Sequence, residues 1–204
     1  MTKVKICGLK SREDIEYVNE LLPDYAGFVF TKSRRRVTLS EAKKFISLLD
    51  KSIKTVGVFQ DEELERVKYA AEYLNLDVIQ LHGNEDKDYI EKLNNFKIWK
   101  AVGVDSKGIC LDDSNEYEVD GILLDSCVKG AKGGTGISFD WNTIINVNLR
   151  KKLILAGGLC PENVEEAVYK VKPYAVDVSS GIEEDGVKSY KKMKNFIEKV
   201  RKII

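Results

Sequence analysis

The sequence contains a single histidine, His82, and four cysteines, none of which forms a C-x-x-C pair. A structural zinc site is therefore not expected, because zinc is held by close sets of Cys and His side chains. A chain of 204 residues that is 43% hydrophobic can build a large core without cross-links, so a disulfide framework is not expected either. These shortages predict a reduced, cytoplasmic protein.

The chain also lacks net charge and long apolar segments. Its 33 basic and 33 acidic side chains balance, so no overall field attracts nucleic acid or an anionic membrane, and any anion site must be local. No apolar run approaches the ~20 residues of a membrane helix. Residues 1–8 lack the apolar stretch and the cleavage site of a signal peptide. We expect no nucleic-acid partner and no membrane partner.

Short apolar, β-branched runs, in contrast, recur along the whole chain. Continuous runs of this kind are typical of strands that are buried on both faces, as in parallel sheets. They are Val4–Cys7, Tyr25–Phe30, Thr55–Phe59, Val78–Leu81, Ile98–Val102, Gly121–Leu124, Leu153–Ala156 and Ala175–Val178.

Helical patterns lie between most of these runs. One apolar face is formed by Leu64, Val67, Ala70, Ala71 and Leu74, and a second by Val187, Tyr190, Met193, Phe196, Ile197 and Val200. Ser11-x-x-Asp14 and Thr38-x-x-Glu41 have the spacing of capping boxes, and Pro161-Glu162 is typical of a first helical turn. The helical pattern is weakest over residues 103–119.

Eight strands, each followed by a helix, predict an α/β fold of the (β/α)₈ TIM-barrel type. No Pro/Gly/Ser-rich linker divides the chain, so residues 1–204 are expected to form a single catalytic domain. An open doubly wound sheet is the alternative. It would require G-x-G-x-x-G after the first strand, where the sequence has Cys7-Gly8-Leu9-Lys10.

Two glycine-containing turns follow the seventh and eighth strands, Gly157-Gly158 and Ser180-Gly181. This fold commonly binds phosphate at that place. Glycines let backbone N–H groups approach an anion, and a helix N-terminus adds a favourable dipole. Either turn alone is more typical of a simple tight turn, but the pair predicts a phosphate site.

Cys7 and Asp125 end the first and sixth strands, where active sites of this fold lie. They are the candidate acid–base pair, since a thiol becomes an effective base or nucleophile when nearby positive charge lowers its pKa. Cys7 could equally be a small buried hydrophobe. Asp125 could be a loop cap or the partner of a lysine. No chemical role is expected for Cys110, Cys127 or Cys160.

His82 and the run Arg34–Arg36 are also at strand ends. His82 could be a catalyst, but we favour a strand-end residue that bonds to backbone. The arginine run could be a solvated loop. Alternatively, guanidinium groups at the barrel mouth could hold a carboxylate or a phosphate bidentately.

The strand ends carry recognisable motifs in order. The first half has Lys5-Ile-Cys-Gly-Leu, Gly27-Phe-Val-Phe, Ser33-x-Arg35, Val56-Gly-Val-Phe, Gln80-Leu-His-Gly and Lys100-Ala-Val. The second half has Leu123-Leu-Asp-Ser, Gly133-Gly-Thr-Gly with Phe139-Asp-Trp, Ala156-Gly-Gly-Leu with Pro161-Glu-Asn-Val, and Ala175-Val-Asp-Val-Ser-Ser-Gly-Ile. Together they cover nearly the whole chain and resemble the phosphoribosylanthranilate isomerase family.

The resemblance implies an isomerase of tryptophan biosynthesis that converts N-(5′-phosphoribosyl)anthranilate into its 1-deoxyribulose isomer by an Amadori rearrangement. It implies no cofactor and no metal, a small phosphosugar–anthranilate substrate as partner, and a monomer or a homodimer. The family's general base matches Cys7, its general acid matches Asp125, and its anthranilate-contacting arginine matches Arg35.

Three rival functions remain open from the sequence. Another phosphosugar isomerase on the same barrel is the nearest, and the histidine-pathway isomerase is an example, although that family uses two aspartates where this chain offers Cys7. A thiol-based redox or binding protein would need a resolving cysteine near Cys7. A non-catalytic phosphate-binding barrel is the third. Loss of anthranilate fluorescence on adding substrate would separate all of these.

Overall fold

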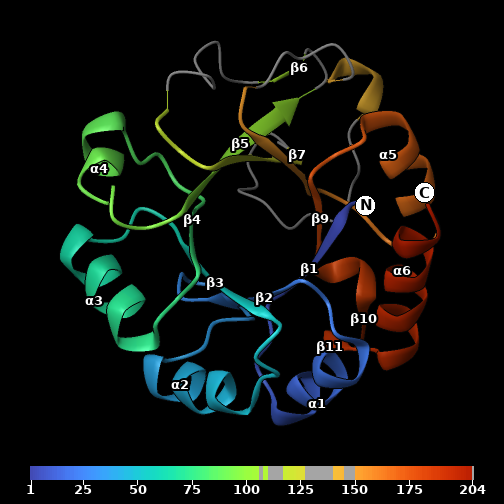
Figure 1. Ribbon diagram of the computed structural model, residues 1–204, viewed down its shortest axis with the longest axis horizontal. Coiled ribbons are helices and arrows are strands. Elements are labelled where there is room, and N and C mark those ends of the chain that lie inside the picture. Colours follow the sequence, from blue (N-terminus) through green and yellow to red (C-terminus); the bar gives the residue numbers. More distant parts are fainter. Residues whose placement is uncertain (106–107, 110–116, 127–139, 145–149, 204) are drawn as a thin grey trace.

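The computed structural model describes residues 1–105, 108–109, 117–126, 140–144 and 150–203. Within these residues, eight parallel strands close into a barrel, because the last strand pairs with the first and every other strand pairs with its neighbours (Figure 1). In order around the barrel they are β1 (Lys3–Cys7), β2 (Tyr25–Val29), β3 (Lys54–Phe59), β4 (Val78–Leu81), β5 (Ile98–Asp105), β7 (Gly121–Ser126), β8 (Lys152–Leu155) and β9 (Ala175–Val178).

Each of the eight apolar runs in the sequence forms a barrel strand. The runs are continuously apolar because the outer face of each strand packs against helices while its inner face packs inside the barrel. On β1, for example, Val4 and Ile6 belong to the core between sheet and helices, and Cys7 belongs to a cluster inside the barrel. The predicted (β/α)₈ fold is confirmed.

Six α-helices surround the barrel in the described part of the chain (Figure 1). Both predicted capping boxes start a helix: Ser11 with Asp14 begins α1, and Thr38 with Glu41 begins α2. The α-helices are α1 (Arg12–Leu21), α2 (Leu39–Leu48), α3 (Leu64–Leu74), α4 (Lys87–Glu91), α5 (Val164–Val171) and α6 (Tyr190–Lys202).

The alternation of strand and helix is less regular than predicted. After β5 the chain forms an antiparallel pair with β6 (Gly108–Ile109), and residues 117–120 contain no helix. Between β7 and β8, the described residues hold a short 3₁₀ helix, η1 (Trp141–Thr143). Pro161-Glu162 lies in a turn, and α5 starts only at Val164.

After β9 the chain forms a second 3₁₀ helix, η2 (Ser180–Ile182), and a small hairpin before α6. The two strands of this hairpin are β10 (Glu183–Glu184) and β11 (Val187–Lys188). The hairpin brings charged side chains back toward the barrel. It therefore contributes directly to the site described below.

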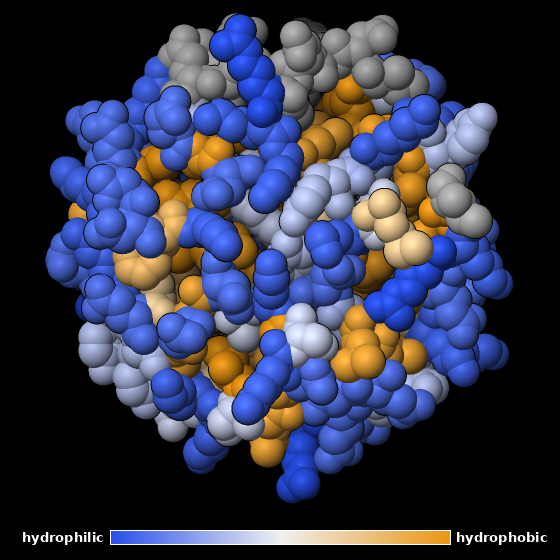
Figure 2. Space-filling model, viewed as in Figure 1, coloured by the Kyte–Doolittle hydropathy of each residue, from blue (hydrophilic) through white to orange (hydrophobic). Residues whose placement is uncertain are grey.

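The interior of the barrel is layered. One end is filled by a cluster that includes Tyr25, Trp99 and Leu123, and the other end by Cys7, Val29 and Val58. Hydrophilic residues cover most of the face that Figure 2 shows, around small hydrophobic patches. None of the helices in the described ranges is long and apolar enough to cross a membrane.

Candidate active site

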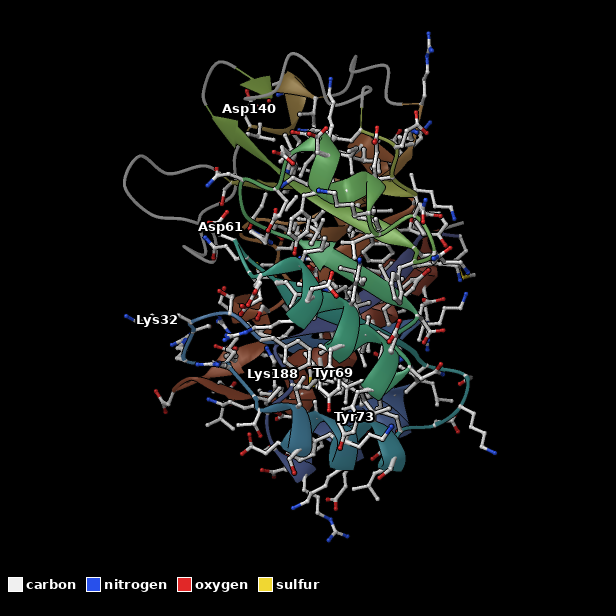
Figure 3. The ribbon with its side chains drawn as sticks, turned by 90° about the vertical axis from the view of Figure 1, so that its left-hand side faces the viewer. Lys32, Asp61, Tyr69, Tyr73, Asp140 and Lys188 are labelled. Carbon is white, nitrogen blue, oxygen red and sulfur yellow. The ribbon has the colours of Figure 1, made fainter. Side chains whose placement is uncertain are left out.

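The cavity lies at the carboxyl ends of the strands. In Figure 3, Lys32 and Asp61, which follow β2 and β3, lie at the same end of the barrel. Among the described residues, the cavity is lined from β1, β2, β3, β4, β7 and β9 and from the loops that follow β2, β3, β4, β8 and β9. The predicted site residues that line it are Cys7, Arg35, Asp125, Gly157, Gly158 and Ser180.

Cys7 ends β1 with its side chain inside the barrel, where it is 8% exposed. It lies beside Gly27 of β2: a Cβ atom at Gly27 would be 2.9 Å from Cys7 Sγ and 3.1 Å from Lys5 Cε. Burial raises the pKa of the Cys7 thiol, and the positive charge of Lys5 opposes this. The net direction is upward, contrary to the lowered pKa that the sequence analysis required of a reactive thiol.

Lys5 is two residues before Cys7, so strand alternation places both side chains inside the barrel. Its Nζ donates to Oδ2 of Asp177, at 2.9 Å, from the adjacent strand β9. Burial acts to lower the pKa of Lys5, but the charges of Asp177 and Cys7 outweigh it and the pKa is raised. Lys5 therefore keeps its positive charge below the cavity.

Asp125 lies on β7, and its Oδ1 accepts from the backbone N–H of Ser126 at 2.8 Å. Its Oδ2 is 3.3 Å from Nε2 of His82, which follows β4, and Nδ1 of that ring is 3.2 Å from Nε2 of Gln80. His82 does bond to backbone, as expected, because its N–H donates to the carbonyl oxygen of Phe59 at 2.8 Å, but its side chain makes further contacts. Its ring lines the cavity and contacts the candidate acid.

The arginine run is organised by Glu183 of β10. Arg35 donates from Nε and Nη2 to the two carboxylate oxygens of Glu183, at 2.6 and 3.0 Å. Lys188 of β11 donates to Oε1 of the same carboxylate at 3.0 Å. Burial acts against ionisation, yet the hydrogen bonds and charges of Arg35 and Lys188 lower the pKa of Glu183 from 4.5 to about 2.

The three arginines differ in their surroundings. Arg35 is the most enclosed, with a side chain 12% exposed, and its Cδ lies so close to Gly8 that any Cβ at that glycine would clash. Arg34 is the arginine of the run that combines exposure with an ion pair. Its side chain is 60% exposed, but it also donates to Glu183 at 2.7 Å. Arg36 is exposed, and within the described residues it lines a different depression, between α2 and α3.

The two glycine turns meet at the cavity. Gly157 and Gly158 have positive φ angles of 81° and 64°, which L side chains rarely adopt. No backbone carbonyl in the described ranges accepts from the N–H groups of Gly157, Gly158 or Ser180. Gly181 does not line the cavity; a Cβ there would clash with the carbonyl oxygen of Leu159, so glycine permits the close contact between the turns.

Several charged residues at the site were missed from the sequence: Lys5, Asp177, Glu183 and Lys188. A signal was present for the first two, because each is a charge inside an otherwise apolar strand run. No such signal marks the hairpin. The segment Gly133–Gly136 lies outside the described residues, as do Cys110 and Cys127. Among described residues, no group of three or more His, Cys, Asp and Glu side chains could hold a metal ion.

Comparison with known proteins decides between the barrel families. Residues 4–199 match the family model described as N-(5′-phosphoribosyl)anthranilate isomerase. The chain belongs to the phosphoribosylanthranilate isomerase family. It is accordingly an isomerase, of class EC 5.3.1.24.

Individual members are similar over their full length. The N-(5′-phosphoribosyl)anthranilate isomerase of Thermoanaerobacter sp. (strain X514) is 53% identical over 203 residues, which is 100% of both chains. The crystal structure of the Thermotoga maritima enzyme is 36% identical, with a TM-score of 0.87 over 98% of this chain and 99% of that one.

A related crystal structure contains a ligand. It is a phosphoribosylanthranilate isomerase in complex with reduced 1-(o-carboxyphenylamino)-1-deoxyribulose 5-phosphate. It is 36% identical to this chain, with a TM-score of 0.82 over 98% of this chain and 99% of that one.

Proposed function

We propose that the chain, as one catalytic domain over residues 1–204, converts N-(5′-phosphoribosyl)anthranilate into 1-(2-carboxyphenylamino)-1-deoxyribulose 5-phosphate in tryptophan biosynthesis. Cys7 is the general base of this Amadori rearrangement and Asp125 the general acid. The observation that carries the proposal is that both side chains line one cavity, from strands β1 and β7. The family membership of the chain supports the same reaction.

The first step needs an acid. Opening the ribose ring requires a proton on the ring oxygen. The bond between this oxygen and C1′ then breaks, the oxygen becomes a hydroxyl group, and the anilino nitrogen forms a protonated Schiff base with C1′. A carboxylic acid can deliver that proton if it is protonated beforehand. Asp125 is 13% exposed in its side chain, and its Oδ2 lies 3.3 Å from Nε2 of His82.

The second step needs a base. The Schiff base makes the hydrogen at C2′ acidic, and the thiolate of Cys7 removes this proton to leave a neutral enolamine. The enolamine then tautomerises to the ketone. Both residues lie at the mouth of the barrel, and strands β9 and β8 separate β1, which carries Cys7, from β7, which carries Asp125. The base and the acid therefore contact the sugar from different strands.

Different residues are proposed to bind the phosphate and the anthranilate carboxylate of the substrate. The backbone N–H groups of Gly157, Gly158, Ser180 and Gly181 are proposed to surround the phosphate, three of these residues lining the cavity and Gly181 holding the turns together. Arg35 is proposed to bind the anthranilate carboxylate. Glu183 occupies its Nε and Nη2, which leaves Nη1 for the substrate.

The test follows the loss of anthranilate fluorescence when substrate is added. Cys7→Ala and Asp125→Asn should each lower kcat by ~10²–10⁴-fold, the usual effect of removing a positioned acid or base. Cys160→Ala and Asp120→Asn are matched controls, since neither residue lines the cavity. Near-normal turnover in folded Cys7→Ala or Asp125→Asn would remove that residue from the mechanism.

A further inference from the structure

Lys5 is a buried charge that the proposed reaction does not use. Its side chain has no exposed surface, although it carries an ammonium group. Removing an ammonium ion from water is unfavourable unless its interactions inside the protein compensate for the lost hydration. We propose that Lys5 is a positioning residue that stabilises the thiolate of Cys7 and so favours the form of this cysteine that can accept a proton. This inference rests on the proposed role of Cys7 as base.

The geometry brings the two side chains together. Lys5 and Cys7 project from the same face of β1, and both reach the space that Gly27 leaves open on β2. A single point there is 2.9 Å from the sulfur of Cys7 and 3.1 Å from Cε of Lys5, the carbon that carries the ammonium group. A larger residue at position 27 would separate the pair.

Asp177 keeps Lys5 in its charged form. The carboxylate is 9% exposed and binds Nζ of Lys5 through Oδ2, while its Oδ1 is buried and has no hydrogen-bond partner in the described part of the chain. The ammonium therefore interacts with a carboxylate on one neighbouring strand and with the thiol on its own strand. Stabilising a thiolate requires a lysine that is protonated, and the ion pair provides it.

The groups that act on Cys7 come from three elements: Lys5 from β1, Asp177 from β9 and Lys188 from β11. Among them the positive charge of Lys5 has the largest effect in favour of the thiolate. Lys188 is bound to Glu183 at 3.0 Å, so its charge is largely matched there. Lys5 is thus the main group that counters the burial of the thiol.

The alternative is that Lys5 and Asp177 form a purely structural ion pair. The same barrel provides a comparison, since Lys100 on β5 pairs with Glu85 at 3.0 Å and is equally enclosed. Lys100 also donates to the carbonyl of Gly83, and it does not line the cavity. Replacing this lysine controls for the loss of a buried ion pair without a change near Cys7.

The experiment measures the rate at which iodoacetamide alkylates Cys7, as a function of pH, by mass spectrometry of the peptide that contains it. In Lys5→Met the midpoint of this profile should rise by about one pH unit or more, since an opposite charge within ~4–6 Å shifts a pKa by about that amount. The double variant Lys5→Met/Asp177→Asn removes both charges, avoids an unpaired carboxylate, and should shift the midpoint in the same direction. Lys100→Met should leave it unchanged.

Activity gives a second readout. In Lys5→Met, kcat at pH 7 should fall about tenfold for each pH unit that the midpoint rises, with little change in KM, and it should recover at high pH. An unchanged alkylation midpoint in both Lys5 variants would overturn the inference, whatever the activity. Failure of the proposed function is distinguishable, because it would be seen as normal turnover in Cys7→Ala.

Discussion

Glu183 connects the hairpin after β9 to the arginine loop, and its removal should change how the stability of the protein depends on pH. Arg35, Arg34 and Lys188 all donate to this carboxylate, which is 5% exposed. Its pKa is lowered to about 2 in the folded chain, against 4.5 when unperturbed. The ionised form of Glu183 is therefore favoured by folding.

The size of the effect follows from this difference. At about 1.4 kcal/mol per pH unit, the lowered pKa corresponds to about 3 kcal/mol of unfolding free energy. Because the folded pKa is the lower one, this stability is fully present above pH 4.5 and is lost as the pH falls toward 2. Glu183→Gln should lack this pH-dependent loss of stability, because its side chain cannot take up a proton in this pH range.

The assay is urea unfolding of wild type and Glu183→Gln at a series of pH values from 7 to 2. We expect the difference in unfolding free energy between the two proteins to be constant above about pH 5 and to shrink by about 3 kcal/mol below it. Glu184→Gln is the matched control, because that neighbouring side chain is 60% exposed and its curve should run parallel to wild type. Parallel curves for Glu183→Gln as well would refute the reasoning.

Three further predictions concern the loops and one helix. Arg35→Lys should lower kcat/KM by about tenfold or more, because a lysine cannot contact Glu183 through two nitrogens and present a third nitrogen to the substrate. Arg36→Lys should match wild type, and equal effects of the two substitutions would remove Arg35 from the site. Gly157→Ala should destabilise the fold by about 1–2 kcal/mol and weaken inhibition by inorganic phosphate. The φ angle of 81° at this position is unfavourable for alanine, and the added Cβ would lie 2.6 Å from the Ser126 nitrogen. An unchanged inhibition constant would argue against a phosphate site at Gly157. Ser11→Ala should cost about 1 kcal/mol in urea unfolding through loss of the α1 capping box, and no measurable change would show that Asp14 alone is sufficient.

The barrel itself was predictable because its signals are local. A strand that is buried on both faces must be apolar throughout, so the eight runs could be found without knowledge of their partners. The capping boxes at Ser11 and Thr38 were equally visible, since both of their partners lie within four residues. Prediction was weaker after β5 and β7, where the predicted helices gave way to an antiparallel pair and a short 3₁₀ helix in the described residues.

Part of the site was also accessible from the sequence. In a parallel barrel all strand ends face one mouth, so Cys7, Asp125 and the turns at Gly157 and Ser180 could be assigned to one place from their positions alone. The contact of the His82 ring with Asp125 could not be predicted in this way, because it joins the ends of β4 and β7, which are not neighbours in the sheet.

The sequence by itself thus determined the eight strands, the starts of α1 and α2, and the end of the barrel at which the site lies. Only the tertiary structure decided the charges around that site. Lys5 and Asp177 are 172 residues apart, and Arg35 and Glu183 are 148 apart. Each of these ion pairs depends on closure of the barrel between β9 and β1, which places the two ends of the chain side by side. Local propensity and hydrophobic pattern carry no information about such a pairing, whereas the geometry of a closed sheet requires it.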